Sequence, residues 1–246
     1  MGERRRTALV TGASRGIGAE TAKLLAIRGY HVVVNYREKR SRALKVVNSI
    51  VQQGGSASVV GADVTVESDV EAMLAEVRVE HGGLDALVLN ASGGLELGAE
   101  PGYPMRVNHD AQVALVDAAL PLMSRGSRLV FVTSHQAHFV ASRDVPAGYV
   151  PIAVSKRAGE DSIRGRQEEL SARGVALSVV SGDMIDGTII VRLLERRDRE
   201  AVNARREVSG LPSIVDFAAA IAAEADCRAT AVSRTVFVGG SDYLGS

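Results

Sequence analysis

Short runs of apolar, mostly β-branched residues recur along the chain, and stretches with helical spacing separate them. The runs cover residues 7–12, 31–36, 57–64, 84–90, 127–134, 175–182 and 235–240. Strands that are apolar on both faces are typical of a parallel sheet covered by helices on both sides. The pattern therefore predicts seven strands in one mostly parallel sheet.

The stretches between these runs carry apolar residues three and four positions apart, which is the spacing of one helix face. They cover residues 19–29, 41–55, 68–83, 111–126 and 155–174. Each ends in or near a glycine, the residue that readily adopts the left-handed conformation after a helix; these are Gly29, Gly54, Gly82, Gly126 and Gly174. Strict alternation of strand and helix predicts a single doubly wound α/β domain of the Rossmann type over residues 1–246.

Composition narrows the class of protein. The formal net charge is +0, so nothing indicates a general attraction to nucleic acid or to an anionic membrane. The single cysteine, Cys227, excludes an internal disulfide and makes a cysteine-based metal site improbable. The apolar run after the basic start stops at Gly12, too short for a secretory signal or a membrane span, so we expect a cytoplasmic protein.

The sequence TGASRGIG, at 11–18, stands where the first predicted strand meets the first predicted helix. Gly12, Gly16 and Gly18 would let the backbone turn tightly and approach a diphosphate at the helix N-terminus, with Ser14 and Ile17 beside it. A glycine-rich turn also joins strand to helix in many proteins that bind no nucleotide. The turn alone therefore does not establish a cofactor.

Further motifs fall in order along the chain: GADV at 61–64, LNASGG at 89–94, RVNHDA at 106–111, RLVFVTS at 128–134 and VSKRAGE at 154–160. Together with the glycine-rich turn, they resemble the short-chain dehydrogenase/reductase family over nearly the whole chain. The resemblance implies a nicotinamide cofactor and, for this family, assembly as a homodimer or homotetramer through the helices that carry Asn108 and Lys156.

The resemblance also implies roles for individual residues at the cofactor. Asp63, followed by Val64, matches the aspartate that holds the adenine amino group. Asn90, with Ala91 and Ser92 after it, matches the turn beside the cofactor ribose, although Ser92 replaces the usual glycine.

The end of the second predicted strand bears on the choice between NAD and NADP. An NAD enzyme usually ends that strand with Asp or Glu, which binds the adenosine 2′-hydroxyl. Here Asn35, Tyr36 and Arg37 occupy that end, and Arg15 precedes Gly16. The two cations suit a 2′-phosphate and favour NADP(H), the alternative being that both are solvated surface residues.

At the chemical end, the resemblance implies that Ser134 is the catalytic serine, that Asn108 orders a water in a proton relay, and that Lys156 binds the nicotinamide ribose. The family's acid/base tyrosine stands four residues before that lysine, where this chain has Ile152. The nearest tyrosine, Tyr149, lies seven residues before the lysine. The position of the general acid is therefore occupied by a residue whose side chain can neither donate nor accept a proton.

Four sources could replace that proton. His135 directly follows the serine and is the first candidate, and His138 and Tyr149 are further protein donors. A substrate hydroxyl beside the ketone is the fourth source. This resembles the situation in some antibiotic-pathway ketoreductases of the superfamily that lack the tyrosine. His135, His138 and Asp144 could in principle bind a metal, but their spacing is weak evidence and no metal is expected.

Residues 181–213 stand where the family has a mobile substrate loop, and they predict a lid of two short helices. Met184, with Ile152, His138 and Tyr149, is expected to line the substrate pocket. Apolar contacts to a substrate are expected from Ile189, Ile190, Val191, Leu193 and Leu194.

Three functions remain open at this point. The first is an atypical NADP-dependent ketoreductase for a polyketide-like or quinone-type ketone. The second is a non-catalytic NADP-binding protein, and the third is a redox-neutral cyclase or dehydratase on the same fold.

Overall fold

A seven-stranded sheet in the order β3-β2-β1-β4-β5-β6-β7 forms the centre of the protein, and every neighbouring pair of strands is parallel. The computed structural model describes residues 4–95, 98, 100–188, 191–192, 195–196, 199–227 and 233–240. The strands are β1 Thr7–Val10, β2 His31–Tyr36, β3 Ser56–Gly61, β4 Leu84–Leu89, β5 Met123–Ser134, β6 Ala176–Gly182 and β7 Arg234–Val238. The predicted parallel sheet is confirmed.

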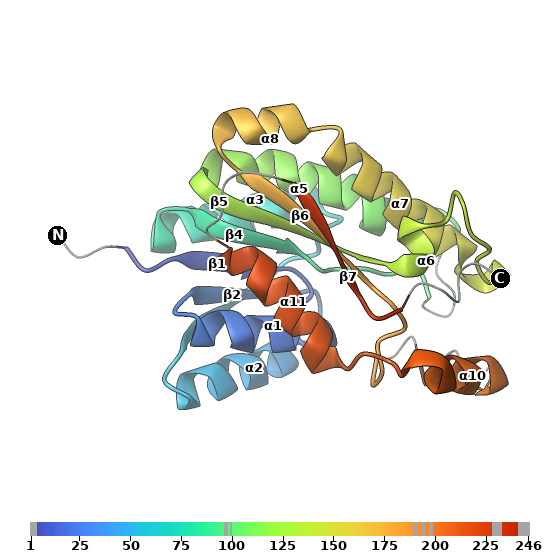
Figure 1. Cartoon of the computed structure of the whole chain (residues 1–246). Coiled ribbons are helices and arrows are strands. Elements are labelled where there is room, and N and C mark those ends of the chain that lie inside the picture. The colour runs from blue at the N-terminus through green and yellow to red at the C-terminus, as the bar shows by residue number, and fades with distance from the viewer. Residues whose placement is uncertain are drawn as a thin grey trace.

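Helices cover both faces of the sheet (Figure 1). The longer ones are α1 Gly16–Ile27, α2 Arg40–Gln52, α3 Glu67–His81, α5 Ala111–Ala119, α7 Val150–Arg164, α8 Gln167–Arg173, α10 Arg199–Ser209 and α11 Ile214–Asp226. The shorter ones are α4 Tyr103–Met105, η1 Arg106–Asp110, η2 Leu120–Leu122, α6 His135–His138 and η3 Ala147–Tyr149. One layer holds α1, α2 and α11, and the other holds α3, α5 and α7 (Figure 1). The five glycines expected after helices all have positive φ.

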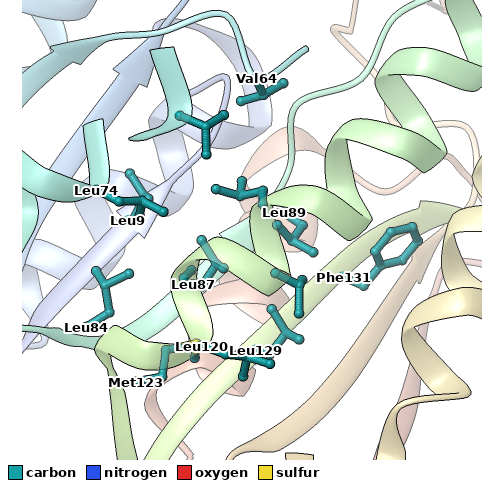
Figure 2. Close-up of a cluster of buried hydrophobic side chains, with 14 of the residues drawn as sticks. Leu9, Val64, Leu74, Leu84, Leu87, Leu89, Leu120, Met123, Leu129 and Phe131 are labelled. Carbon is teal, nitrogen blue, oxygen red and sulfur yellow. The ribbon is translucent and has the colours of Figure 1, made fainter. Parts of the chain in front are cut away.

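The core divides into two apolar clusters, one on each side of the sheet, because successive residues of a strand point to opposite faces. In β1, Leu9 belongs to one cluster, while Ala8 and Val10 belong to the other. Figure 2 shows the first cluster, where Leu87, Leu89 and other strand residues meet side chains of the covering helices. Each fully buried leucine contributes roughly 1.5–3 kcal/mol.

Three elements differ from the sequence-based prediction. The stretch expected as one helix over 155–174 forms two, α7 and α8. The helix expected over 111–126 ends at Ala119, and β5 already begins at Met123. Pro121 lies in the intervening 3₁₀ turn, where its missing N–H would have cost a helix one backbone hydrogen bond. Helix α11 was not predicted, although Ser213 and Asp216 form a capping box at its start.

The strand order places a switch point at the carboxyl ends of β1 and β4, because the chain runs outward from β1 through β2 to β3 and then returns to β4 on the other side. In open α/β sheets, ligands bind in the crevice at such a point. No helix of the described ranges is long and apolar enough to cross a membrane.

Candidate active site

The glycine-rich turn after β1 leaves room for an anion. Gly12 and Gly16 have φ of 63° and 57°, the left-handed region that favours glycine. A Cβ on Gly18 would lie 2.5 Å from Asn90 Nδ2, whereas one on Gly16 would meet no atom of the described residues within 4 Å. The N-cap residue of α1, Arg15, makes no side-chain capping bond, and the first turn of α1 has no acidic residue. The free N–H groups of that turn therefore fit a phosphate.

Thr11 and Asn90 tie this turn to the end of β4. The Thr11 hydroxyl is buried and accepts hydrogen bonds from the backbone N–H of Asn90 (3.0 Å) and of Ala91 (2.9 Å). Asn90 Nδ2 donates to the Thr11 carbonyl at 2.8 Å. Asn90 thus holds the turn in shape, while Ser92 beyond it is exposed. Sequence analysis missed Thr11, whose only signal is its place directly before the glycine turn.

Asn35 points inward from the end of β2. Its Oδ1 accepts from the Gly12 N–H at 3.1 Å, and its Nδ2 donates to the Ala62 carbonyl at 3.1 Å. The side chain is 2% exposed. Asn35 therefore joins the glycine turn to the end of β3, and its amide oxygen and nitrogen each bind a backbone group rather than turning outward to a cofactor ribose.

The two predicted 2′-phosphate cations lie on the surface. Arg15 and Arg37 are exposed. Arg37 donates to the Tyr103 hydroxyl at 2.5 Å and pairs with Glu38 at 2.8 Å. Tyr36, between Asn35 and Arg37, is half-buried and packs on Gly61.

Asp63 keeps one carboxylate oxygen available. Its Oδ1 accepts from the backbone N–H (2.9 Å) and the hydroxyl (2.7 Å) of Thr65. Its Oδ2 makes no hydrogen bond with the residues that the structure describes, so it could accept one from an adenine amino group. Val64 beside it is buried in the core.

Ser134 stands at the carboxyl end of β5 and is the N-cap of α6, where its Oγ accepts from the Ala137 N–H at 3.3 Å. The same Oγ lies 3.3 Å from the hydroxyl of Tyr149. Tyr149 ends the 3₁₀ turn η3 and is 5% exposed. Burial raises the pKa of Tyr149, and the hydrogen bond with Ser134 opposes this in part. Among the predicted proton donors, Tyr149 is therefore the one whose side chain lies within hydrogen-bond distance of the Ser134 hydroxyl.

Ile152 lies one turn further along, in the first turns of α7, and is 3% exposed. It shares an apolar cluster with Ala137, Tyr149 and Ala153. A Cβ on Gly94 would lie 3.1 Å from Ile152 Cγ1, so the chain after β4 packs closely on this residue. Ile152, expected at the position of the family tyrosine, is thus part of an apolar wall.

Lys156 and Asn108 lie on facing elements, α7 and η1. Asn108 Nδ2 donates to the Gly93 carbonyl and to Ser155 Oγ, both at 3.0 Å. η1 is a π-helical turn, a deviation that is frequent at functional sites. Burial lowers the pKa of Lys156 to about 8. Its ammonium makes no hydrogen bond or ion pair with the described residues, so it can bind a ligand hydroxyl.

The two histidines of α6 point elsewhere. His135 is 0% exposed, its Nδ1 lies 2.9 Å from Ser181 Oγ, and burial lowers its pKa. The imidazole is fully buried against β6, so a substrate at the strand end would meet Ser134 before it, and the role of His135 as proton donor stays a prediction. His138 Nδ1 pairs with the buried Glu160 at 2.8 Å. No group of three or more metal-binding side chains occurs among the described residues.

The predicted lid segment is anchored by a buried ion pair. Arg205 of α10 contacts Asp183, directly after β6, and both side chains are buried. Arg205 also donates to the Gly240 carbonyl at 3.0 Å. Met184 is half-buried beside this pair and Val191 is buried, while Ile189, Ile190, Leu193 and Leu194 lie outside the described residues. Ala153 and Gly159 of α7 are buried within the chain itself.

Comparisons with known proteins find the same fold in solved structures. A crystal structure of the angucycline C-6 ketoreductase LanV with bound NADP matches with a TM-score of 0.82 and 28% identity, covering 96% of this chain and 95% of that one. The promiscuous reductase LugOII, which catalyses keto-reduction at C1 during lugdunomycin biosynthesis, matches with a TM-score of 0.80 and 26% identity over 96% of this chain and 97% of that one.

Among curated relatives, the 1-cyclohexenylcarbonyl-CoA reductase of Streptomyces collinus is 34% identical over 75% of this chain. The match spans 66% of that relative's length, just under two thirds. Residues 6–198 match the family model of the short chain dehydrogenases. The chain therefore belongs to the short-chain dehydrogenase family of oxidoreductases.

Proposed function

We propose that this protein is an NADPH-dependent ketoreductase for a polyketide-like or quinone-type ketone. The observation that carries the proposal is the pair of hydroxyls, Ser134 and Tyr149, 3.3 Å apart at the carboxyl end of the sheet. A hydroxyl pair there can bind and protonate a carbonyl oxygen. The likeness to LanV and LugOII, both reductases of ketones, supports the same reaction class.

Several side chains are suited to hold NADPH, which would supply the hydride. The free N–H groups at the start of α1 would bind the diphosphate. Asp63 would accept a hydrogen bond from the adenine amino group through its free oxygen. Arg15 and Arg37 are exposed cations able to pair with a 2′-phosphate, and Lys156 would bind the nicotinamide ribose hydroxyls.

The ketone would lie against Ser134, because this hydroxyl is half-buried at the strand end. The surroundings favour an apolar, flat substrate. Ile152 replaces a phenol with an alkyl group, and it adjoins Gly94 and the Tyr149 cluster. Met184, on the segment after β6, adds a further adaptable apolar side chain.

The first test has two arms. NADPH and NADH are titrated against the protein by fluorescence, with Arg37→Ala and Arg15→Ala as variants and Arg78→Ala, on the remote helix α3, as the matched control. A panel of aromatic ketones and hydroxyquinones is then incubated with the protein and NADPH, and the products are identified by mass spectrometry.

We expect NADPH to bind more tightly than NADH, and we expect Arg37→Ala and Arg15→Ala to reduce that preference while Arg78→Ala does not. A product alcohol whose mass exceeds that of the ketone by two hydrogen atoms supports the proposal. Binding without any product would instead indicate a non-catalytic NADP-binding protein. Conversion of substrate with NADPH unconsumed would indicate a redox-neutral cyclase or dehydratase.

A further inference from the structure

The hydroxyl of Tyr149 reaches the site only through Ser134. Tyr149 is 5% exposed and packs against Ala137, Ile152 and Ala153, with Leu95, Val140 and Val145 around the same cluster. Its hydroxyl has Ser134 Oγ as its hydrogen-bond partner. Ser134 is the more exposed of the two. A substrate at the strand end would therefore meet the serine first, with the phenol behind it.

The bonds already made by Ser134 fix the direction in which protons can pass. A serine oxygen can accept two hydrogen bonds and donate one. One acceptor position is filled by the Ala137 N–H at the start of α6. If the phenol donates into the second, the serine keeps its own hydrogen for a substrate oxygen. The opposite arrangement would leave a buried phenolic hydrogen without an acceptor, which is unfavourable.

The phenol is held in its protonated form. Burial raises its pKa above the ordinary tyrosine value, and the Ser134 hydrogen bond opposes this only in part. The titratable and charged groups on the elements around it are His135 and His138 on α6, Arg143 and Asp144 on the loop, and Lys156, Arg157 and Glu160 on α7.

We propose that Ser134 delivers the proton to the substrate oxygen and that Tyr149, from behind, replaces it, so that two protons move along one relay. This inference rests on the proposed ketoreductase function. Bound NADPH would supply a hydride to the carbonyl carbon, and the electron pair of the C=O π bond would move onto oxygen. That oxygen takes the serine hydrogen and the serine oxygen takes the phenolic hydrogen; once the alcohol has left, water returns a proton to the phenolate through Ser134.

The relay makes the enzyme directional in its pH dependence. In reduction the phenol must be protonated, so its ionisation lowers the rate only as pH rises through the raised pKa of Tyr149; loss of the Lys156 charge, with a pKa of about 8, is a separate effect on cofactor binding. In oxidation of the alcohol the same group must be ionised, so that rate is small at neutral pH and rises toward the same pKa. A reductase that works poorly in reverse at neutral pH is the result.

The experiment measures single-turnover reduction by the NADPH-loaded protein in mixtures of light and heavy water. Two protons in flight give a curved dependence of the rate on the deuterium fraction, and a single donor gives a straight line. Tyr149→Phe keeps the ring in its apolar cluster and should lower the rate about a hundredfold or more, in the range of a positioned general acid. Tyr30→Phe removes another buried phenolic hydroxyl, at the amino end of β2, and is the matched control.

Two readouts separate this relay from a structural effect and from failure of the ketoreductase proposal. NADPH affinity should be the same in Tyr149→Phe as in the wild type. Ultraviolet titration of tyrosinate should show one high-pKa phenol fewer in Tyr149→Phe, with that of Tyr30 (pKa about 12) remaining, and the Tyr149 phenol shifted further upward in Ser134→Ala. A wild type that reduces ketones with a linear isotope dependence, or a Tyr149→Phe rate near the wild-type rate, overturns the relay. A wild type that reduces no ketone overturns the ketoreductase proposal itself.

Discussion

Replacing Asn35 by alanine should destabilise the protein because this side chain bridges two backbone segments. The variant leaves the Ala62 carbonyl buried without its donor, which costs about 1–3 kcal/mol. The Gly12 N–H is only part-buried, so water can replace the lost acceptor and the cost there is about 0.5–1.5 kcal/mol. The sum is roughly 1.5–4.5 kcal/mol, a large share of the ~5–15 kcal/mol that holds a typical domain folded.

Urea denaturation of the wild type and of Asn35→Ala measures this difference directly. Arg37→Ala, two residues on, is the matched control, because an exposed ion pair contributes about 1 kcal/mol or less. NADPH affinity should fall with Asn35→Ala as the glycine turn loses its tether. A loss of stability below about 1 kcal/mol, equal to that of the control, would refute the reasoning from the buried carbonyl.

Asn35→Asp sharpens the same prediction. A carboxylate here would face the Ala62 carbonyl oxygen at the position where the amide donates, so its folded-state pKa would rise above the unfolded value. The variant is then least destabilised at low pH, where the group is protonated, and loses stability as pH rises through the folded pKa. It should also gain no NADH affinity, because the side chain points away from the ribose. Tighter NADH binding would show that the side chain can turn outward.

Two further variants test the energetic effect of buried charges near the site, those of Arg205 and Lys156. Arg205→Met should lower the free energy of unfolding by about 3–5 kcal/mol in urea denaturation, because Asp183 is left as a buried, unpaired charge. Adding Asp183→Leu should restore much of this loss. An unchanged urea midpoint in Arg205→Met would contradict a stabilising role for the buried ion pair between α10 and the end of β6. Lys156→Met should be more stable than the wild type by roughly 3 kcal/mol at most, because burial lowers the lysine pKa to about 8. Because the folded pKa lies below the unfolded value, the gain in free energy of unfolding is full below pH ~8 and disappears as pH rises toward ~10.4. A gain that does not depend on pH would argue against burial of the charged lysine as its cause.

The arrangement of strands and helices could be predicted from sequence because it depends on local pattern. Each predicted strand overlaps an observed one, and the glycines expected after helices have the left-handed conformation. Departures arose where one residue outweighs the pattern. Pro121 ends a helix that apolar spacing alone would have continued, and the capping box at Ser213 begins one that was not predicted.

The candidate site was predicted less completely because it depends on contacts between distant segments. Nothing in the alternation of β2 tells whether Asn35 faces the cofactor or the backbone of β3. Spacing from Lys156 put Tyr149 one turn before the family position, so it ranked below His135 as a donor; the 3₁₀ turn η3, which spacing does not reveal, brings its hydroxyl to Ser134. His135 follows the serine in sequence, yet the turn into α6 directs its imidazole to Ser181.

The most direct test of the account is single-turnover oxidation of NADPH by the wild-type protein with two ketones that differ only in a hydroxyl group next to the carbonyl. Because the proton is proposed to come from Ser134 and Tyr149, both ketones should be reduced at comparable rates. Reduction of the hydroxylated ketone alone would mean that the substrate supplies its own proton. If neither ketone is reduced, and no other ketone of the panel is reduced either, the assignment as a ketoreductase is contradicted.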